Sequence, residues 1–257
     1  MTQTNRTAIV TGGLSGMGLA IARRLSRDGI DVTIGARRGG DSQTAHDILG
    51  SLASELRVAA LDVRSSESVD AFVAEVADRR GGVDILVNAA GVYEEAGIIG
   101  HPDRIWTDHI DTNLSGTFRM IRAAMPHMKA AGWGRIVNMA SVAAHAGMAD
   151  NAAYCASKAG LLGLGRCVSL EGAAHGITCV SISPTWVETE MLKRFIDADV
   201  SASGRARDDV RAEYAASNPQ HQLVQPEEIA ELAAFLVGDG ARAITMEDIQ
   251  VNAGSLW

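Results

Sequence analysis

Short apolar runs alternate with longer amphipathic runs from one end of the chain to the other. The short runs are rich in Val and Ile, which is typical of buried strands, whereas apolar positions three or four apart in the longer runs indicate helices. We predict strands at residues 7–11, 31–36, 56–61, 83–88, 135–140, 177–183 and 248–251. We predict helices at residues 16–28, 66–80, 154–174 and 226–237, with further helical stretches within 42–54 and within 103–130. Pro126 lies in the last stretch, where it predicts a kink or a break.

This order of elements predicts an α/β fold. Strands that alternate with helices form βαβ units, whose right-handed crossovers bury a parallel sheet between two layers of helices. We therefore predict a doubly wound, Rossmann-type, seven-stranded parallel sheet with helices on both faces. Residues 1–257 are expected to form one domain, because this length can bury a single large core.

One segment interrupts the alternation. Residues 188–225 are mostly polar and charged, and they follow the sixth predicted strand. Ligands bind at the carboxyl ends of strands in such sheets, so this insertion is predicted to form a lid of short helices over a substrate. The alternative is a mobile excursion on the surface.

Composition narrows the classes of partner. The net charge of −8 argues against a nucleic acid or an anionic membrane as partner. No apolar run approaches the roughly 20 residues that span a membrane, and we expect a cytoplasmic protein. Cys155, Cys167 and Cys179 lack the Cys-x-x-Cys spacing of zinc sites, so we predict buried free thiols and no metal site. A reactive thiol at Cys155 is the alternative.

A glycine-rich turn follows the first predicted strand. Gly12, Gly16 and Gly18 lie in it together with Ser15 and Met17, and a predicted helix begins there. Glycines let the backbone approach a pyrophosphate, which the positive end of the helix attracts. The turn therefore predicts nucleotide binding, although glycines also mark ordinary turns.

The end of the second predicted strand bears on the choice of nucleotide. An NAD site is expected to have an acidic residue there, whereas this chain has Ala36 followed by Arg37 and Arg38. Two guanidinium groups suit the 2′-phosphate of NADP, so we predict NADP, with NAD possible. The alternative is a pair of solvated arginines.

Residues 138–158 contain a candidate acid–base group. Tyr154 and Lys158 are four residues apart on a predicted helix, which places both on one face. A nearby ammonium group lowers the pKa of a phenol, and Ser141 could hold the oxygen that Tyr154 protonates. The spacing alone also fits a packed tyrosine beside a solvated lysine.

With these pieces in place, nearly the whole chain resembles the short-chain dehydrogenase/reductase family, in its branch of single-domain members of about 250 residues. The glycine turn, Ser141, Tyr154 and Lys158 match its motifs in order. Asn113 matches the family's catalytic asparagine. The matching cofactor positions are Asp62, Val63, Asn88, Ala89, Gly91, Pro184, Val187 and Thr189.

The resemblance implies a mechanism. Tyr154 exchanges a proton with the substrate oxygen while hydride passes to or from a nicotinamide, and Ser141 orients that oxygen. Lys158 lowers the pKa of Tyr154 and, like Tyr154 itself, contacts the cofactor. Asn113 anchors a water molecule in a proton relay. The resemblance further implies a homotetramer or homodimer, with the predicted helices within 103–130 and at 154–174 as contact faces.

The chain departs from the family pattern at three places. Ala89 replaces the second asparagine of the Asn-Asn-Ala-Gly motif, and Thr185 replaces a glycine after the sixth strand. Residues 252–257 match the usual ending only loosely.

The pocket residues expected from motif positions are Tyr93, Glu94, Glu95, His145, Met148, Trp186 and Met191. A core position for Trp186 and a solvated His145 are the alternatives.

We therefore predict an NADP(H)-dependent oxidoreductase that interconverts a ketone and a secondary alcohol. The first alternative is an NAD-dependent secondary-alcohol dehydrogenase. The second, from another functional class, is a catalytically silent protein that senses nucleotides. The intact set of Asn113, Ser141, Tyr154 and Lys158 argues against it.

Overall fold

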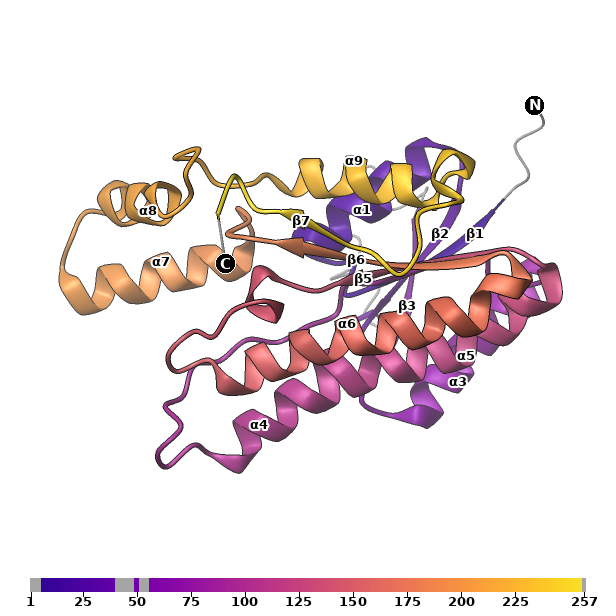
Figure 1. Cartoon of the computed structure of the whole chain (residues 1–257), viewed down its shortest axis with the longest axis horizontal. Helices are drawn as coiled ribbons and strands as arrows, with labels where there is room; N and C mark the ends of the chain where they lie inside the picture. The colour runs from indigo at the N-terminus through magenta and orange to yellow at the C-terminus, as the bar shows by residue number, and fades with distance from the viewer. Residues whose placement is uncertain (1–5, 40–48, 51–55, 256–257) are drawn as a thin grey trace.

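The computed structural model describes residues 6–39, 49–50 and 56–255. Its centre is one parallel sheet of seven strands in the order β3-β2-β1-β4-β5-β6-β7 (Figure 1). This is the predicted doubly wound arrangement, in which the strand order reverses between β1 and β4. The strands are β1 Thr7–Thr11, β2 Asp31–Ala36, β3 Arg57–Ala60, β4 Ile85–Asn88, β5 Gly134–Met139, β6 Ile177–Pro184 and β7 Asp248–Val251.

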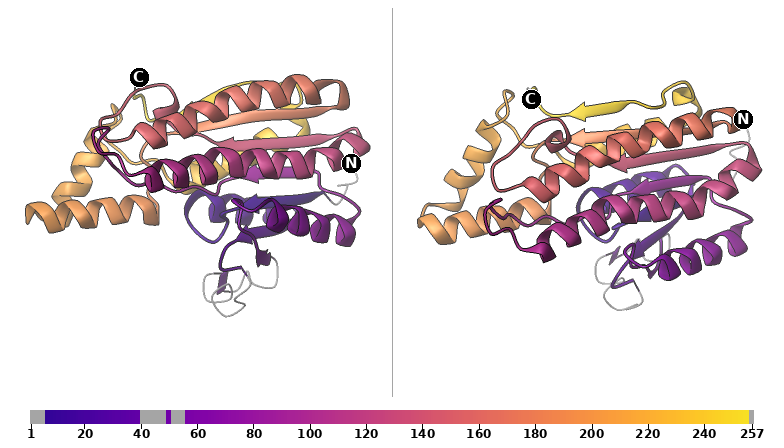
Figure 2. Two further views of the ribbon diagram at one scale, coloured as in Figure 1. Left: turned by 90° about the horizontal axis from the view of Figure 1, so that it is seen from below. Right: turned by 60° about the horizontal axis from the view of Figure 1, so that its bottom comes forward.

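Helices cover both faces of the sheet. Helices α1 and α9 lie on one face, and α3, α5 and α6 lie on the other (Figure 1). Figure 2 shows α5 and α6 running side by side along the strands. The α-helices are α1 Gly16–Arg27, α3 Ser66–Arg80, α4 Asp103–His109, α5 Gly116–Ala131, α6 Ala152–Gly172, α7 Glu190–Ser203, α8 Arg207–Ala216 and α9 Pro226–Val237.

Alternation along the strands builds two cores. Val10 of β1 packs in the cluster on the α1 and α9 side, whereas its neighbour Ile9 packs in the cluster on the α3, α5 and α6 side. Every residue of β1, β4, β5 and β6 is buried, while the edge strands β3 and β7 keep exposed positions. Such fully buried central strands are expected when helices cover both faces.

Most predicted elements lie within two residues of the observed bounds. Helix α6 begins at Ala152, two residues before Tyr154, and α9 has the predicted bounds. The predicted helix within 42–54 falls mostly outside the described residues.

The stretch 103–130 differs most from the prediction. It contains α4, then a π-helical segment Ile110–Ser115, then α5, which runs through Pro126 without a break. The predicted break is therefore wrong. Pro126 lies on the exposed face of α5, where water can satisfy the carbonyl group that loses its partner. The irregularity lies instead around the buried Asn113.

Residues 188–225, which we call the lid segment, contain the two helices α7 and α8. Both extend beyond the carboxyl ends of the strands (Figure 1). They share a small apolar core that includes Leu192, Ile196 and Val210. Among the described residues, no helix is long and apolar enough to cross a membrane.

Candidate active site

Two adjoining cavities lie at the carboxyl ends of the strands. The first, which we call the nucleotide cavity, follows the glycine turn and the ends of β2 and β3. The second, which we call the Tyr154 cavity, lies between β5, α6 and the lid segment. Residues that line both cavities are Met17, Ala89, Gly91, Val92, Thr189 and Met191.

The glycine turn has a backbone that only glycine fits. Gly12 has a φ of +67°, and a Cβ atom there would lie 2.8 Å from the Cα atom of Ala90. A Cβ atom on Gly18 would lie 2.7 Å from the carbonyl oxygen of Gly12. The turn thus packs tightly against β4 and leaves its outer side open for a ligand. Gly12, Ser15, Gly16, Met17 and Gly18 all line the nucleotide cavity, and their contact with a cofactor stays a prediction.

Thr11 connects this turn to the segment after β4. Its hydroxyl oxygen accepts hydrogen bonds from the backbone amides of Ala89 and Ala90, both at 3.1 Å. The two chain segments on either side of the strand-order reversal are therefore held together at the floor of the cavity.

Four arginines line the nucleotide cavity. Arg37 and Arg38 line it and are exposed, as the prediction of a phosphate site requires. Arg64 and Arg194 also line it and were not predicted. Arg64 follows Asp62 by two residues, a signal visible in the sequence, whereas Arg194 reaches the cavity only because α7 folds over it.

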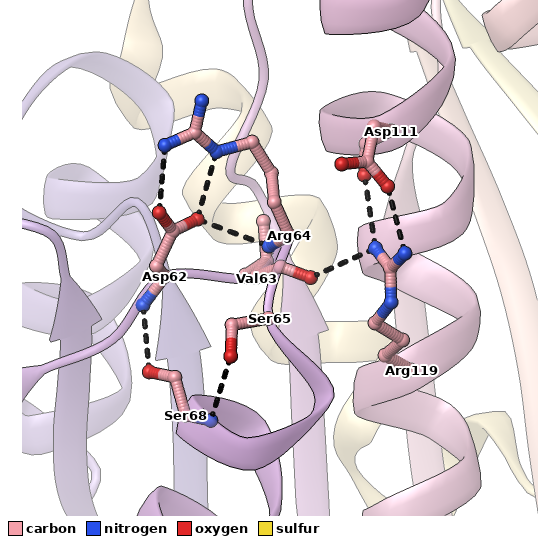
Figure 3. Close-up of polar contacts among 7 residues, drawn as sticks. All are labelled: Asp62, Val63, Arg64, Ser65, Ser68, Asp111 and Arg119. Atoms are coloured by element: carbon pink, nitrogen blue, oxygen red, sulfur yellow. Dashed lines mark hydrogen bonds and ion pairs between the residues drawn. The ribbon is translucent and has the colours of Figure 1, made fainter.

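Asp62 and Arg64 form a two-pronged ion pair (Figure 3). Arg64 Nε donates to Asp62 Oδ1 at 2.9 Å, and Arg64 Nη2 donates to Asp62 Oδ2 at 2.7 Å. The guanidinium group lowers the pKa of Asp62 to about 2. Asp62 is thus a fixed carboxylate at the wall of the nucleotide cavity.

Arg119 fastens the next residue, Val63, to the π-helical segment (Figure 3). Its guanidinium donates to the carbonyl oxygen of Val63 at 3.3 Å and to Asp111 Oδ1 at 2.7 Å. Arg119 therefore joins the loop after β3 to the segment that carries Asn113.

Asn88 does not line either cavity, which corrects its prediction as a cofactor contact. Its Nδ2 donates to Asn138 Oδ1 at 2.9 Å, within the register pair that joins β4 to β5. The side chain is buried between two strands, so Asn88 stabilises the sheet beneath the site.

Ser141 lies directly after β5, where it caps a short 3₁₀ turn, Val142–Ala144. Its hydroxyl oxygen accepts a hydrogen bond from the amide of Ala143 at 3.2 Å. The hydroxyl proton is left to donate elsewhere, and the side chain lines the Tyr154 cavity.

Lys158 lies one helical turn after Tyr154 on α6 and is 6% exposed. Its ammonium nitrogen donates to the carbonyl oxygen of Met139 at 2.7 Å and lies 5.6 Å from the centre of the Tyr154 ring. Burial lowers the pKa of Lys158 to about 8. The charged form is therefore disfavoured, although it remains dominant at neutral pH.

Burial raises the pKa of Tyr154, while the nearby Ser141 hydroxyl acts in the opposite direction. The sequence suggested that Lys158 would lower this pKa. Burial is the largest of these effects, so the net pKa of Tyr154 in the protein alone lies above its ordinary value, and the lowering by Lys158 stays a prediction. Tyr154 is thus a protonated phenol, ready to act as a donor.

Asn113 is 1% exposed and all its side-chain hydrogen-bonding atoms are engaged. Its Oδ1 accepts from the amide of Val92 at 2.8 Å, and its Nδ2 donates to the carbonyl of Val92 and the hydroxyl of Ser157, both at 3.0 Å. The side chain therefore joins the segment after β4, the π-helical segment and α6 around the site.

Four of the predicted pocket residues line the Tyr154 cavity, namely Tyr93, Met148, Trp186 and Met191. His145 does not. Its Nε2 lies 2.6 Å from Asp248 Oδ2 on β7, so its prediction as a pocket residue is wrong. Phe195, Leu192 and Val142 also line the cavity and were not predicted. Pro184 and Val187 line the Tyr154 cavity, and Thr189 lines both cavities.

Aromatic rings connect Tyr154 to the lid segment. Tyr93 packs edge to face against Tyr154 and Phe195, with ring centres 4.8 and 4.7 Å apart. Trp186 packs in the same manner against Tyr214 at 5.0 Å. The rings support the phenol of Tyr154 and form a wall of the cavity.

His109 is a buried residue of the site that sequence reasoning missed. Its Nδ1 lies 2.7 Å from the carbonyl oxygen of Ile105, and its Nε2 accepts from the amide of Glu94 at 3.1 Å. These two partners require the neutral tautomer with the proton on Nδ1. The ring lies 6.1 Å from that of Tyr154, where it acts as packing.

Among the described residues, no group of three or more His, Cys, Asp or Glu side chains could hold a metal ion.

Comparison with known proteins agrees with this geometry. A family model described as enoyl-(acyl carrier protein) reductase matches residues 12–255. A D-β-hydroxybutyrate dehydrogenase from Rhizobium meliloti is 38% identical over 253 residues, covering 97% of this chain and 98% of the relative. The 3-oxoacyl-(acyl-carrier-protein) reductase FabG from Vibrio cholerae is 34% identical over 254 residues, covering 99% and 98%.

A solved structure is also similar over the full length. A crystal structure of an actinorhodin polyketide ketoreductase variant with NADPH has a TM-score of 0.91 and 37% identity, and the match covers 98% of each chain. Together with the family model and the relatives, this likeness assigns the family. The chain belongs to the short-chain dehydrogenase/reductase family of oxidoreductases, which act on CH–OH and C=O groups.

Proposed function

We propose that the protein is an NADP(H)-dependent oxidoreductase that interconverts a ketone and a secondary alcohol. The observation that carries the proposal is the position of the Ser141 and Tyr154 hydroxyls in a cavity that adjoins the glycine-turn cavity. A carbonyl group next to both hydroxyls would lie beside the boundary of the two cavities, where a nicotinamide can reach it.

The residues of the nucleotide cavity fit a dinucleotide. The close approach of Gly12 and Gly18 to neighbouring backbone leaves the space that a pyrophosphate needs. Arg37 and Arg38, with no acid at Ala36, favour a 2′-phosphate, and the similar ketoreductase structure contains NADPH. The cofactor supplies the hydride. The remaining proposed contacts are Ser15, Gly16, Met17, Asp62, Val63, Ala89, Gly91, Tyr154, Lys158, Pro184, Val187 and Thr189.

Each catalytic side chain has a distinct task. Tyr154 donates its phenolic proton to the carbonyl oxygen during reduction and accepts it back during oxidation. Ser141 donates a second hydrogen bond to that oxygen and fixes its position. Lys158 supplies a buried positive charge next to the phenol, which stabilises the phenolate that forms when the proton leaves.

We propose that Asn113 is a positioning residue, which holds neighbouring segments of the site in place. Its amide group holds Val92 at the wall of the cavity and Ser157 on α6, one residue before Lys158. Since its side-chain atoms are engaged, a proton relay would use backbone groups rather than the amide of Asn113.

The test is transfer of label from NADPH that carries deuterium at C4 to a panel of ketones. The proposal expects one deuterium at the carbinol carbon of the product alcohol. NADH that binds more tightly than NADPH and supports turnover would favour the NAD-dependent alternative. Tight binding of NADPH without transfer to any ketone would favour a nucleotide-sensing protein.

The lid segment is proposed to cover the substrate. The Tyr154 cavity is lined by Met191 and Phe195 of the lid segment and by Trp186, which lies just before it. The position of the lid segment therefore determines the shape of that cavity. Limited proteolysis between α7 and α8 with and without NADPH and a ketone tests this role. Slower cleavage in the ternary mixture is expected.

We also propose a homotetramer or homodimer in which α5 and α6 form contacts between subunits. Phe118 on α5 is 45% exposed and Leu170 on α6 is 69% exposed, which suits a covered apolar surface. Light scattering should give a multiple of the 27.0 kDa chain mass. A cytoplasmic location is proposed because all three cysteines are free, and cell fractionation tests it.

A further inference from the structure

The Tyr154 cavity is uncharged apart from one buried group. Among the described residues that line it, Lys158 is the only one with an ionisable basic or acidic side chain other than the phenols. The rest of the wall is largely thioether, aliphatic and aromatic, and Met148, Trp186 and Phe195 line this cavity and not the nucleotide cavity.

Most polar atoms in this wall already have partners. Thr185 Oγ1 donates to Asn218 Oδ1 at 3.0 Å, and the hydroxyl of Tyr93 donates to Glu95 Oε1 at 2.7 Å. Thr189 Oγ1 accepts from the amide of Leu192 at 3.5 Å, where the two cavities meet. The hydroxyls of Ser141 and Tyr154 are the ones that the carbonyl oxygen itself uses.

The charges nearest to the cavity are directed elsewhere. The ammonium of Lys158 donates to Met139. On the lid segment, Lys193 pairs with Glu190 at 2.6 Å and Arg211 pairs with Glu188 at 2.8 Å. Arg194 lines the nucleotide cavity and not this one. A carboxylate beside the reacting carbonyl would therefore lose its water, and the one cation of the wall, Lys158, is already bonded to Met139 and adjoins the phenol.

We infer that the substrate is an uncharged ketone whose carbonyl carries an apolar or aromatic body, and that free keto acids and hydroxy acids are rejected. The inference rests on the proposed function, because it concerns the same site. It separates this protein from the similar relative that acts on D-β-hydroxybutyrate, whose substrate is a carboxylate. An ester or thioester of a keto acid can bind in the cavity, because it carries no negative charge.

A matched pair of substrates tests the inference. Benzoylacetate and ethyl benzoylacetate share the ketone and the ring and differ only in the charge. We expect kcat/KM for reduction of the ester to exceed that of the acid by at least about 100-fold, since an unpaired carboxylate would be buried. A ratio below about threefold would overturn the inference.

Binding keeps the test independent of turnover. Trp186 lines the cavity, so quenching of its fluorescence reports ligand affinity, and Trp186→Phe identifies that signal. If neither compound is reduced, tighter binding of the ester still supports the inference while the proposed reaction fails. Equal affinity for acid and ester contradicts the inference whether or not turnover occurs.

A new charge provides the reciprocal test. Met148 is half-buried at the cavity wall, whereas Ala149 beside it is exposed and does not line the cavity. Met148→Lys is expected to raise kcat/KM for benzoylacetate by about 10-fold or more, since it supplies the missing cation. Ala149→Lys is the matched control and should leave the ratio of ester to acid unchanged. The same gain in kcat/KM for benzoylacetate in both variants would contradict the claim that the cavity wall excludes carboxylates.

Discussion

His145 and Asp248 join the turn after Ser141 to the edge strand β7 through a hydrogen bond of 2.6 Å. The same carboxylate accepts a hydrogen bond from Ser183 on β6 at 2.7 Å. Ser141 caps the turn that ends at His145, so Asp248 fixes the Ser141 hydroxyl from a distance. His145 is therefore a positioning residue and not part of the cavity wall.

His145→Ala is expected to lower kcat/KM for the ketone by about 10-fold, which corresponds to one lost charge-assisted hydrogen bond. The dissociation constant of NADPH should not change, because His145 lies outside the nucleotide cavity. His145→Gln should recover part of the activity through a neutral hydrogen bond to Asp248. Steady-state kinetics and cofactor titration measure both quantities, and a parallel loss of NADPH binding would refute the assignment.

The buried ammonium of Lys158 predicts a dependence of stability on pH. Its pKa falls from 10.5 in water to about 8 in the folded protein, so the unfolded chain binds more protons between these values. The free energy of unfolding should therefore rise with pH in this window, by about 3 kcal/mol relative to Lys158→Met. Urea titrations of both proteins from about pH 8 to 10.5 measure the difference. Parallel curves would show that Lys158 is not destabilised by burial.

Arg37 and Arg38 predict the choice of cofactor. Changing both to Gln should raise the dissociation constant of NADPH by about 10-fold or more, because each guanidinium can make a charge-assisted hydrogen bond to a 2′-phosphate. The affinity for NADH should stay the same, since NADH lacks this phosphate. Calorimetric titration with both nucleotides gives the answer. Equal weakening of both would mean that the arginines bind another part of the cofactor.

The pair of Glu188 and Arg211 predicts how the lid segment is held. Arg211 Nε and Nη2 donate to the two oxygens of Glu188 at 3.0 and 2.8 Å, which fastens α8 to the chain beside Val187. Arg211→Ala is expected to raise KM for the ketone by about 2- to 5-fold, because a partly exposed ion pair contributes up to about 1 kcal/mol.

The matched control for this experiment is Arg205→Ala. Arg205 pairs with Glu213 at 2.6 Å between exposed positions within the lid segment itself. Its loss should leave KM unchanged. Added salt should reduce the difference between the wild type and Arg211→Ala, and an unchanged difference would argue against an ionic origin.

Local patterns in the sequence predicted the sheet and the two halves of the site. Alternating apolar and amphipathic runs were sufficient for the doubly wound order, and Gly12, Gly16 and Gly18 marked the turn that lines the nucleotide cavity. The spacing of Tyr154 and Lys158 placed both on α6. In each case the signal lies within a few neighbouring residues.

The features that were missed depend on residues far apart in the chain. His145 meets Asp248 across 103 positions, and Asn113 meets Val92 across 21, which no local pattern encodes. The π-helical segment forms around Asn113, where these contacts compete with regular helical geometry. The raised pKa of Tyr154 likewise arises from burial by elements that assemble only in the fold.

The most direct test of the account is the Tyr154→Phe variant, which removes the phenolic oxygen and keeps the ring that packs against Tyr93. Reduction of ethyl benzoylacetate, or of any ketone that the wild type reduces, should be followed with NADPH, together with the dissociation constant of NADPH. We predict that kcat falls by about 10²- to 10⁴-fold, as expected for the loss of a general acid, while NADPH affinity changes by less than about threefold. Turnover within about threefold of the wild type would contradict the assignment of Tyr154 as the proton donor.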